Sequence, residues 1–212
     1  MKSKEQVGAI IAALKTLYPD ALCSLDYEKD YELLFSVRLA AQCTDARVNL
    51  VTPALFARYP TLEAFAAADV DEVGTYIHSC GFWRAKARDI VGSAKMLVER
   101  FGGKVPDNME DLLSLPGVGR KTANLILGDV YGKEGYVCDT HCIRITGRLG
   151  ITDGSKDPLK VEQQLRKTIP PEESSDFCHR MVLHGRALCM ARGPKCEECP
   201  LKTLCDYGTN PQ

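Results

Sequence analysis

Four cysteines close to the end of the chain have a spacing that allows them to ligate one compact centre. Cys189, Cys196, Cys199 and Cys205 form the pattern C-x6-C-x2-C-x5-C within 17 residues. Four thiolates are typical ligands of iron-sulfur clusters and of zinc. Structural zinc sites usually contain two C-x2-C pairs, whereas only Cys196 and Cys199 form such a pair here. The spacing therefore favours a [4Fe-4S] cluster, with zinc, or free or disulfide-bonded cysteines, as the alternatives.

A turn that contains two glycines can bring backbone amides close to an anion. Gly117 and Gly119 lie in the stretch Leu-Pro-Gly-Val-Gly-Arg-Lys at residues 115–121, which leads directly into a predicted helix. Glycine adopts positive φ readily and lets a ligand approach the backbone, and the first amides of a helix point out of its N-terminus. A phosphate group fits such a site. A Walker nucleotide loop is disfavoured, because no strand precedes the turn and the G-K-[ST] arrangement is absent.

Lys121, in the first turn of that predicted helix, is a candidate nucleophile. The positive end of the helix dipole and the neighbouring Arg120 both disfavour protonation of its amine. A neutral amine is what a Schiff-base nucleophile requires, and a solvated or phosphate-contacting lysine is the alternative. Asp139, which begins another predicted helix, is the candidate carboxylate partner, although it is also explained as a helix N-cap.

The elements that position these residues are predicted to be helices. Strand signals are scarce, and apolar residues recur at helical spacing between Gly, Pro, Asp, Ser and Thr, so we predict an all-α fold. Asp107 with Glu110 resembles a capping box, and Pro53 is expected to start, kink or break the helix in which it lies. The predicted helices cover residues 4–18, 31–41, 45–59, 84–101, 120–131, 140–149 and two segments between Asp157 and Leu188.

Composition and charge describe an ordinary folded chain. Of the 212 residues, 45% are hydrophobic, and 27 Lys and Arg balance 28 Asp and Glu, so the net charge does not demand a nucleic-acid partner. A local basic edge beside the cysteines either contacts phosphates or only offsets the charge of a cluster; it consists of Arg186, Arg192, Lys195 and Lys202. No apolar run approaches the roughly 18 residues of a membrane span, and no export signal is present, so we expect a soluble cytoplasmic protein.

Taken together, these motifs resemble the endonuclease III family of helix-hairpin-helix DNA glycosylases. The matching segments are residues 115–124, residues 137–141 and the cysteine tail, together with residues 39–45 and 81–87. The resemblance implies a two-lobed fold, with a six-helix domain over residues 23–134 that contains the helix-hairpin-helix at about 108–131. It implies an iron-sulfur cluster domain formed by residues 1–22 together with 135–212. DNA would lie across the cleft between the two lobes.

The same resemblance implies a bifunctional glycosylase and abasic-site lyase that acts on oxidised or ring-saturated pyrimidines, such as thymine glycol, in duplex DNA. The lysine that matches Lys121 attacks C1′ of a flipped nucleotide, and the aspartate that matches Asp139 activates it or stabilises the sugar cation. Gln42 and Phe82 match loop positions that fill the gap left by that nucleotide, although the family position of Phe82 is typically aliphatic. The hairpin residues expected to contact phosphate are Gly117, Val118, Gly119 and Arg120, with Lys195 as a further contact.

Three rival functions stay open at this point. A lyase specialised for abasic sites, or a glycosylase for uracil or mismatched thymine, shares the fold and the lysine. The adenine-removing branch of the family lacks the lysine that is present here as Lys121. A non-catalytic iron-sulfur DNA-binding module needs neither Lys121 nor Asp139. We expect damaged double-stranded DNA as the partner, no membrane, a monomer, and a bacterial-type cytoplasmic location at the nucleoid.

Overall fold

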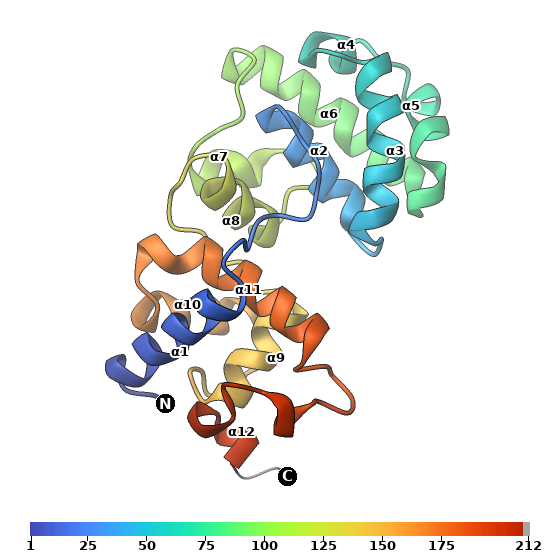
Figure 1. Cartoon of the computed structure of the whole chain (residues 1–212). Helices are drawn as coiled ribbons and strands as arrows, with labels where there is room; N and C mark the ends of the chain where they lie inside the picture. The colour runs from blue at the N-terminus through green and yellow to red at the C-terminus, as the bar shows by residue number, and fades with distance from the viewer. Residues whose placement is uncertain (210–212) are drawn as a thin grey trace. The chain divides into compact units, whose positions relative to one another are not determined.

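The computed structural model describes residues 1–209, and all regular secondary structure in this range is helical (Figure 1). This confirms the prediction of an all-α fold. No helix among the described residues combines the length and the apolar composition that are needed to cross a membrane. The chain divides into two compact units. The central unit is Cys23–Tyr131, and the terminal unit combines Met1–Leu22 with Gly132–Gln212.

The central unit is built from consecutive helices with short connections. In chain order they are α2 (Asp30–Ala40), α3 (Asp45–Arg58), α4 (Leu62–Ala66), α5 (Val70–Ile77), the 3-10 helix η1 (His78–Cys80), α6 (Trp83–Phe101), α7 (Met109–Ser114) and α8 (Arg120–Asp129). Both α4 and α5 pack on the long helix α6, while α8 packs on α7 and α2. The packing of α8 on α2 and α7 places the predicted hairpin against the core of this unit.

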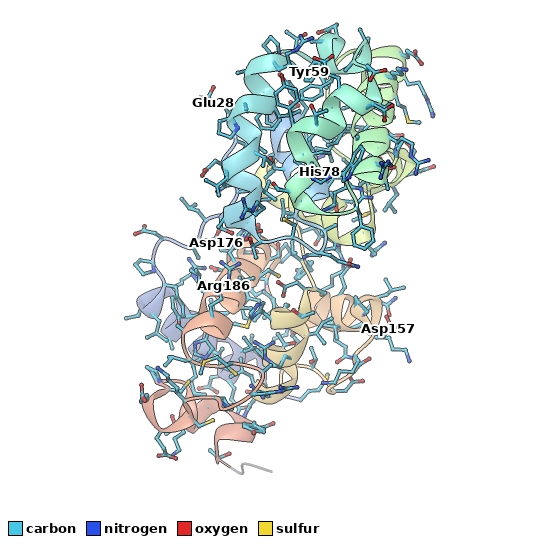
Figure 2. All side chains as sticks on the ribbon, turned by 90° about the vertical axis from the view of Figure 1, so that its right-hand side faces the viewer. Glu28, Tyr59, His78, Asp157, Asp176 and Arg186 are labelled. Carbon is cyan, nitrogen blue, oxygen red and sulfur yellow. The ribbon has the colours of Figure 1, made fainter. Side chains whose placement is uncertain are left out.

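An aromatic cluster forms much of the core of the central unit. The ring of Phe65 on α4 is fully buried and lies 5.0 Å from Phe35 on α2 and 5.1 Å from Tyr59. Tyr59, labelled in Figure 2, follows the last residue of α3. Large aromatic side chains bury much apolar area, and such ring pairs add to the free energy of folding beyond the area itself. The cluster therefore joins three helices that the chain presents in succession.

Two local predictions in the central unit are wrong in detail. The cap of α7 is Asn108, whose side chain accepts from the backbone N–H of Asp111 at 2.9 Å, and not Asp107. An asparagine is as good a cap as an aspartate, so the sequence alone does not separate neighbouring candidates. Helix α3 neither starts nor breaks at Pro53, because the buried Val48, Thr52 and Leu55 hold it against the core.

The terminal unit joins both ends of the chain. It contains α1 (Lys4–Leu17), α9 (Thr140–Leu149), α10 (Pro158–Thr168), the 3-10 helices η2 (Pro171–Glu173), η3 (Cys196–Glu198) and η4 (Lys202–Leu204), α11 (Ser174–Ala187) and α12 (Asp206–Thr209). Helix α11 packs on both α1 and α9. A capping box between Ser3 and Gln6 starts α1, whose buried face is formed by Val7, Ile10, Ile11 and Leu14. The N-terminal helix is thus part of the core around the C-terminal segment.

We predict that Gly74→Ala destabilises the central unit by about 1–3 kcal/mol. A Cβ at position 74 would lie 2.5 Å from two ring carbons of Trp83, so α5 and α6 would have to move apart. Trp83 is the only tryptophan of the chain, and denaturant unfolding followed by its fluorescence measures the effect directly. The control is Gly8→Ala in α1, where an added Cβ meets no atom within 4 Å. This control is expected to stabilise the protein slightly in unfolding followed by circular dichroism, and a neutral Gly74→Ala would contradict the packing.

Candidate functional site

The predicted hairpin lies between α7 and α8 and makes a sharp turn. Gly117 has a φ of 71°, in the left-handed region that favours glycine, and the amide of Val118 donates to the carbonyl of Leu115 at 3.2 Å. Gly119 has an ordinary φ of −100° and is the N-cap of α8, without a capping side chain. The first amides of α8 therefore point out of the helix without a side-chain partner at the cap.

An ion pair between residues of two other helices packs against the hairpin. The guanidinium of Arg38 on α2 donates to Asp89 Oδ2 on α6, with Nε at 2.7 Å and Nη2 at 2.6 Å. A Cβ at Gly117 would lie 2.6 Å from both Arg38 Nε and Asp89 Oδ2, so only glycine fits against this pair. The hydroxyl of Ser93 donates to the carbonyl of Pro116 at 2.9 Å. The turn is therefore fixed by tertiary contacts as well as by its own backbone.

Lys121 is exposed in the first turn of α8, where the sequence predicted it. Its side chain has no hydrogen bond or ion pair within the part of the chain that the structure describes. A Cβ at Gly119 would meet no atom within 4 Å, so the space in front of the helix is open to an approaching ligand. Buried residues on the other side of α8, from Ala123 to Leu127, fix the helix to the unit. The amine is thus presented on a packed helix beside an N-terminus that has no capping side chain.

Gln42 and Phe82 have an unusual backbone in common. Gln42 has a φ of 54° and Phe82 a φ of 48°, and no other non-glycine residue of the described chain has a positive φ. Such conformations cost free energy in residues with a Cβ and persist only where the surroundings impose them. Phe82 is also 69% exposed, which is unfavourable for a large aromatic side chain in water. This exposure excludes the alternative interpretation of Phe82 as a core aromatic residue packed beside Trp83.

Asp139 is the N-cap of α9 and is half-buried in the terminal unit. Its Oδ1 accepts from the backbone N–H of Cys142 at 2.7 Å. Its Oδ2 has no hydrogen bond within the described residues. The cap therefore fixes the orientation of the carboxylate and leaves one oxygen available for chemistry. Asp139 and Lys121 belong to different units of the chain.

The four C-terminal cysteines line one cavity in the terminal unit. All ten cysteines of the chain are free thiols, so the described residues contain no disulfide. No group of three or more His, Cys, Asp or Glu side chains in the described range is arranged to hold a single metal ion. What Cys189, Cys196, Cys199 and Cys205 share is therefore a common cavity. The aliphatic side chains of Ile145, Leu149, Leu188 and Leu201 complete much of its wall.

Several donors point at the sulfur atoms of this cavity. Arg148 Nη1 lies 3.3 Å from Cys189 Sγ, and the backbone amide of Gly208 lies 3.3 Å from Cys205 Sγ. Such donors stabilise anionic sulfur. Burial raises the pKa of Cys199 and of Cys205, and the neighbouring thiolates raise both further. Positive charge at the centre of the cavity would offset that repulsion, which is how a metal cluster retains deprotonated thiolates.

The basic edge beside the cysteines is smaller than the sequence indicates. Lys202 is paired with Glu197 at 2.6 Å. Arg192 and Lys195 are exposed, and no ion pair involves either of them within the described residues. These two side chains are therefore available to a phosphate.

Sequence reasoning missed the residues that support the site from other helices. Arg38 and Asp89 hold the hairpin, while Arg148 contacts the cysteine loop from α9. His184 on α11 is buried, with Nε2 3.6 Å from Cys199 Sγ and Nδ1 3.1 Å from the hydroxyl of Tyr18. None of these residues belongs to a local motif, and only the tertiary packing shows their partners. The nearest sequence signal is the position of His184, five residues before Cys189.

Comparison with known proteins identifies the family of the chain. Residues 35–171 match the model of the HhH-GPD superfamily, described as base excision DNA repair proteins. The chain is 49% identical to endonuclease III from Synechocystis sp. over 203 residues, covering 95% of this chain and 92% of that protein. It is 39% identical to endonuclease III from Bacillus subtilis over 208 residues, covering 98% and 95%. These matches extend over both units.

The solved structures agree with the sequence matches. A trapped covalent intermediate of an endonuclease III with DNA superimposes with a TM-score of 0.92 at 41% identity, covering 99% of this chain and 98% of that one. A thermostable thymine-DNA glycosylase has the same fold, with a TM-score of 0.87 at 21% identity and 97% of each chain covered. The predicted resemblance is therefore confirmed, and the chain belongs to the endonuclease III family of HhH-GPD base excision DNA repair proteins.

Proposed function

We propose that this chain is a bifunctional DNA glycosylase and abasic-site lyase that removes oxidised or ring-saturated pyrimidines from double-stranded DNA. The observation that carries the proposal is the exposed amine of Lys121, held directly behind the hairpin on a rigid helix, in a member of the endonuclease III family. A related endonuclease III has been trapped as a covalent intermediate with DNA. A pure DNA-binding module would need no such amine, so the catalytic function is favoured over it.

The chemistry begins with a nucleotide that has left the base stack. Extrusion costs a few kcal/mol, and a poorly stacked damaged base lowers that cost. The lone pair of Lys121 Nζ then forms a bond to C1′, the glycosidic bond breaks, and the base departs with the electron pair and takes up a proton. The amine loses a proton in the same stage. The product is a nucleotide without its base, joined to the enzyme through nitrogen.

The same lysine then serves the lyase reaction. Opening of the sugar ring converts the C1′–N bond into an imine, and O4′ takes up a proton. The imine acidifies the C2′ proton, whose removal expels the 3′ phosphate by β-elimination. Water hydrolyses the imine, which frees Lys121 and leaves an unsaturated aldehyde on the 3′ end. One amine thus catalyses both base removal and strand cleavage.

The role that we propose for Asp139 follows from its two oxygens. Oδ1 holds the cap of α9, and Oδ2 is available to accept the proton of the attacking amine or to stabilise positive charge on the sugar. A carboxylate held by a cap needs little reorganisation when charge develops. The cap and the catalytic role are therefore compatible in one residue.

The hairpin, together with Gln42 and Phe82, would bind the DNA itself. Amides around Gly117 to Arg120 are suited to phosphate oxygens, which positions the duplex without reading its sequence. Val118 is half-buried within this turn. Gln42 and the exposed ring of Phe82 are suited to the gap that an extruded nucleotide leaves, and Lys195 to a further phosphate.

The cavity of the four cysteines fits a [4Fe-4S] cluster, because it offers four sulfur ligands, an aliphatic wall and N–H donors to sulfur. When bound, such a cluster would supply a rigid, fully ligated cross-link and no open coordination site for chemistry. We propose the terminal unit as the cluster domain and damaged duplex DNA as the partner of a monomer. The bacterial relatives favour a cytoplasmic location for this reaction.

We predict that Lys121→Ala abolishes strand cleavage while duplex affinity changes by no more than a few fold. The substitution removes the nucleophile and leaves the backbone amides of the hairpin in place. The measurement pairs single-turnover cleavage of an abasic duplex with a binding titration at fixed salt. Lys104→Ala, an exposed lysine of the same unit, is the control and should cleave at the wild-type rate. Residual cleavage at full rate by Lys121→Ala would rule out the assignment.

We predict that Asp139→Asn lowers the single-turnover rate by about 10²- to 10⁴-fold and leaves stability and DNA affinity nearly unchanged. Asparagine retains the oxygen that caps α9 and removes the negative charge. Asp139→Ala is the matched comparison, since it should also lose about 1 kcal/mol of stability with the cap. If the asparagine variant keeps its rate and only the alanine variant suffers, Asp139 is a helix cap without a catalytic role.

We predict that purified protein contains iron and inorganic sulfide, and that Cys189→Ser lowers both, together with visible absorption and DNA affinity. Loss of one thiolate opens the ligand set, so the loop around the cavity loses its cross-link. Cys23→Ser, in the other unit, should keep the full content. Stoichiometric zinc without iron, or a colourless Cys189→Ser that folds and acts normally, would contradict the cluster assignment.

A further inference from the structure

A lysine is buried in the central unit without a carboxylate partner. The side chain of Lys86, in the first turn of α6, is 1% exposed. Its ammonium donates to the backbone carbonyls of Leu39 at 2.7 Å and Cys80 at 2.8 Å. Lysines are almost never fully buried unless they are paired. Burial lowers the pKa of Lys86, which reflects the unfavourable environment for its charge.

The two carbonyls lie at the ends of two separate elements. Leu39 is the penultimate residue of α2, and Cys80 is the last residue of η1. The ammonium therefore joins two chain segments that are 41 residues apart in sequence. A charged donor makes stronger hydrogen bonds to carbonyls than a neutral one, particularly where water is excluded.

Each of these carbonyls shortly precedes one of the two strained residues. Gln42 follows Leu39 by three residues, and Phe82 follows Cys80 by two. They are the two non-glycine residues with positive φ in the described chain. Both side chains are exposed, so packing of the side chains does not hold their backbones in these conformations. The surroundings that impose the strain must therefore act through the backbone segments beside them.

We propose that Lys86 is a positioning residue for DNA engagement. Its ammonium ties the end of α2 to the end of η1, and this holds Gln42 and Phe82 in left-handed conformations as one preformed pair. The inference rests on the proposed function, in which both residues enter the gap left by an extruded nucleotide. A preformed pair needs no ordering when DNA binds, so the free energy of binding is available for extrusion of the nucleotide.

The test is a double-mutant comparison on a damaged duplex. Lys86→Met keeps the length of the side chain and removes the ammonium, and Gln42→Ala/Phe82→Ala removes the side chains through which it would act. We expect Lys86→Met to lower the single-turnover rate by about 10²-fold, as misplacement near a reacting centre does. In the Gln42→Ala/Phe82→Ala background, the same substitution should have an effect of less than about threefold, because coupled residues are not additive.

A fluorescence measurement separates positioning from a general loss of stability. The probe is 2-aminopurine placed opposite an abasic site, whose emission rises when its stacking in the duplex is disturbed. At saturating protein, wild type should raise the emission and Lys86→Met should not. Lys95→Met, an exposed lysine of the same helix, is the control and should behave as wild type in rate and emission.

Different results would contradict the role of Lys86 and the proposed function. Additive effects in the two backgrounds, or wild-type rates and emission for Lys86→Met, would overturn the role of Lys86. Lys86→Gln, whose amide keeps two donors, is prepared in parallel and should recover part of the lost rate. If both variants are unfolded, the ammonium supports the whole unit and the inference fails. A wild-type protein that cleaves no abasic duplex would instead contradict the proposed function.

Discussion

The position of the Lys121 amine depends on one tight bend of the backbone at Gly117. The bend needs a positive φ, and a side chain at this position would collide with the ion pair between Arg38 and Asp89. That ion pair comes from α2 and α6, so the hairpin is seated on two of the helices that build the central unit. Helix α8 begins three residues after the bend, and Lys121 in its first turn is exposed to solvent. The position of Lys121 is thus a consequence of the tight packing of Gly117.

Helix α9 plays the corresponding role in the terminal unit. Its N-terminus is capped by Asp139, and Arg148 in its last turn contacts the sulfur of Cys189 and the carbonyl of Met190. One helix therefore connects the candidate catalytic carboxylate with the cysteine cavity. Tyr18, directly after the N-terminal helix, hydrogen-bonds His184, which in turn approaches Cys199. Both ends of the chain therefore contribute to the surroundings of the cysteine cavity.

Much of the fold follows from local sequence signals, and the remainder depends on tertiary contacts. Helical spacing and caps are short-range properties, and helix α9 has the predicted bounds, Thr140–Leu149. Pro53 is different, since local stereochemistry alone indicates a break and only the packing of Val48 and Leu55 explains why α3 continues. The cap of α7 differs by one residue for a simpler reason, because Asn108 and Asp107 are adjacent and both residue types are good N-caps.

The candidate site also has a part that local sequence signals predict and a part that only tertiary packing explains. Lys121, Asp139 and the four cysteines lie in short motifs, and the resemblance of those motifs to a known family, rather than spacing alone, implies the roles expected of Lys121 and Asp139. The residues that support them cannot be predicted in this way, because Arg38, Lys86 and Arg148 meet their partners only after distant segments have packed together. The left-handed backbone of Gln42 and Phe82 also has no sequence signature, since residues with a Cβ rarely adopt it. Local sequence signals therefore do not show which distant residues hold the candidate catalytic and DNA-binding side chains in place.

In the proposed reaction, Lys121 forms the covalent bond to DNA. The most direct measurement is borohydride reduction of the wild-type protein on two duplexes, one with thymine glycol and one with an abasic site, followed by proteolysis and mass spectrometry of the adduct. We predict trapping on both duplexes, with the sugar attached to Lys121 in a single modified peptide. An adduct on another residue, or no adduct with either duplex, would contradict it.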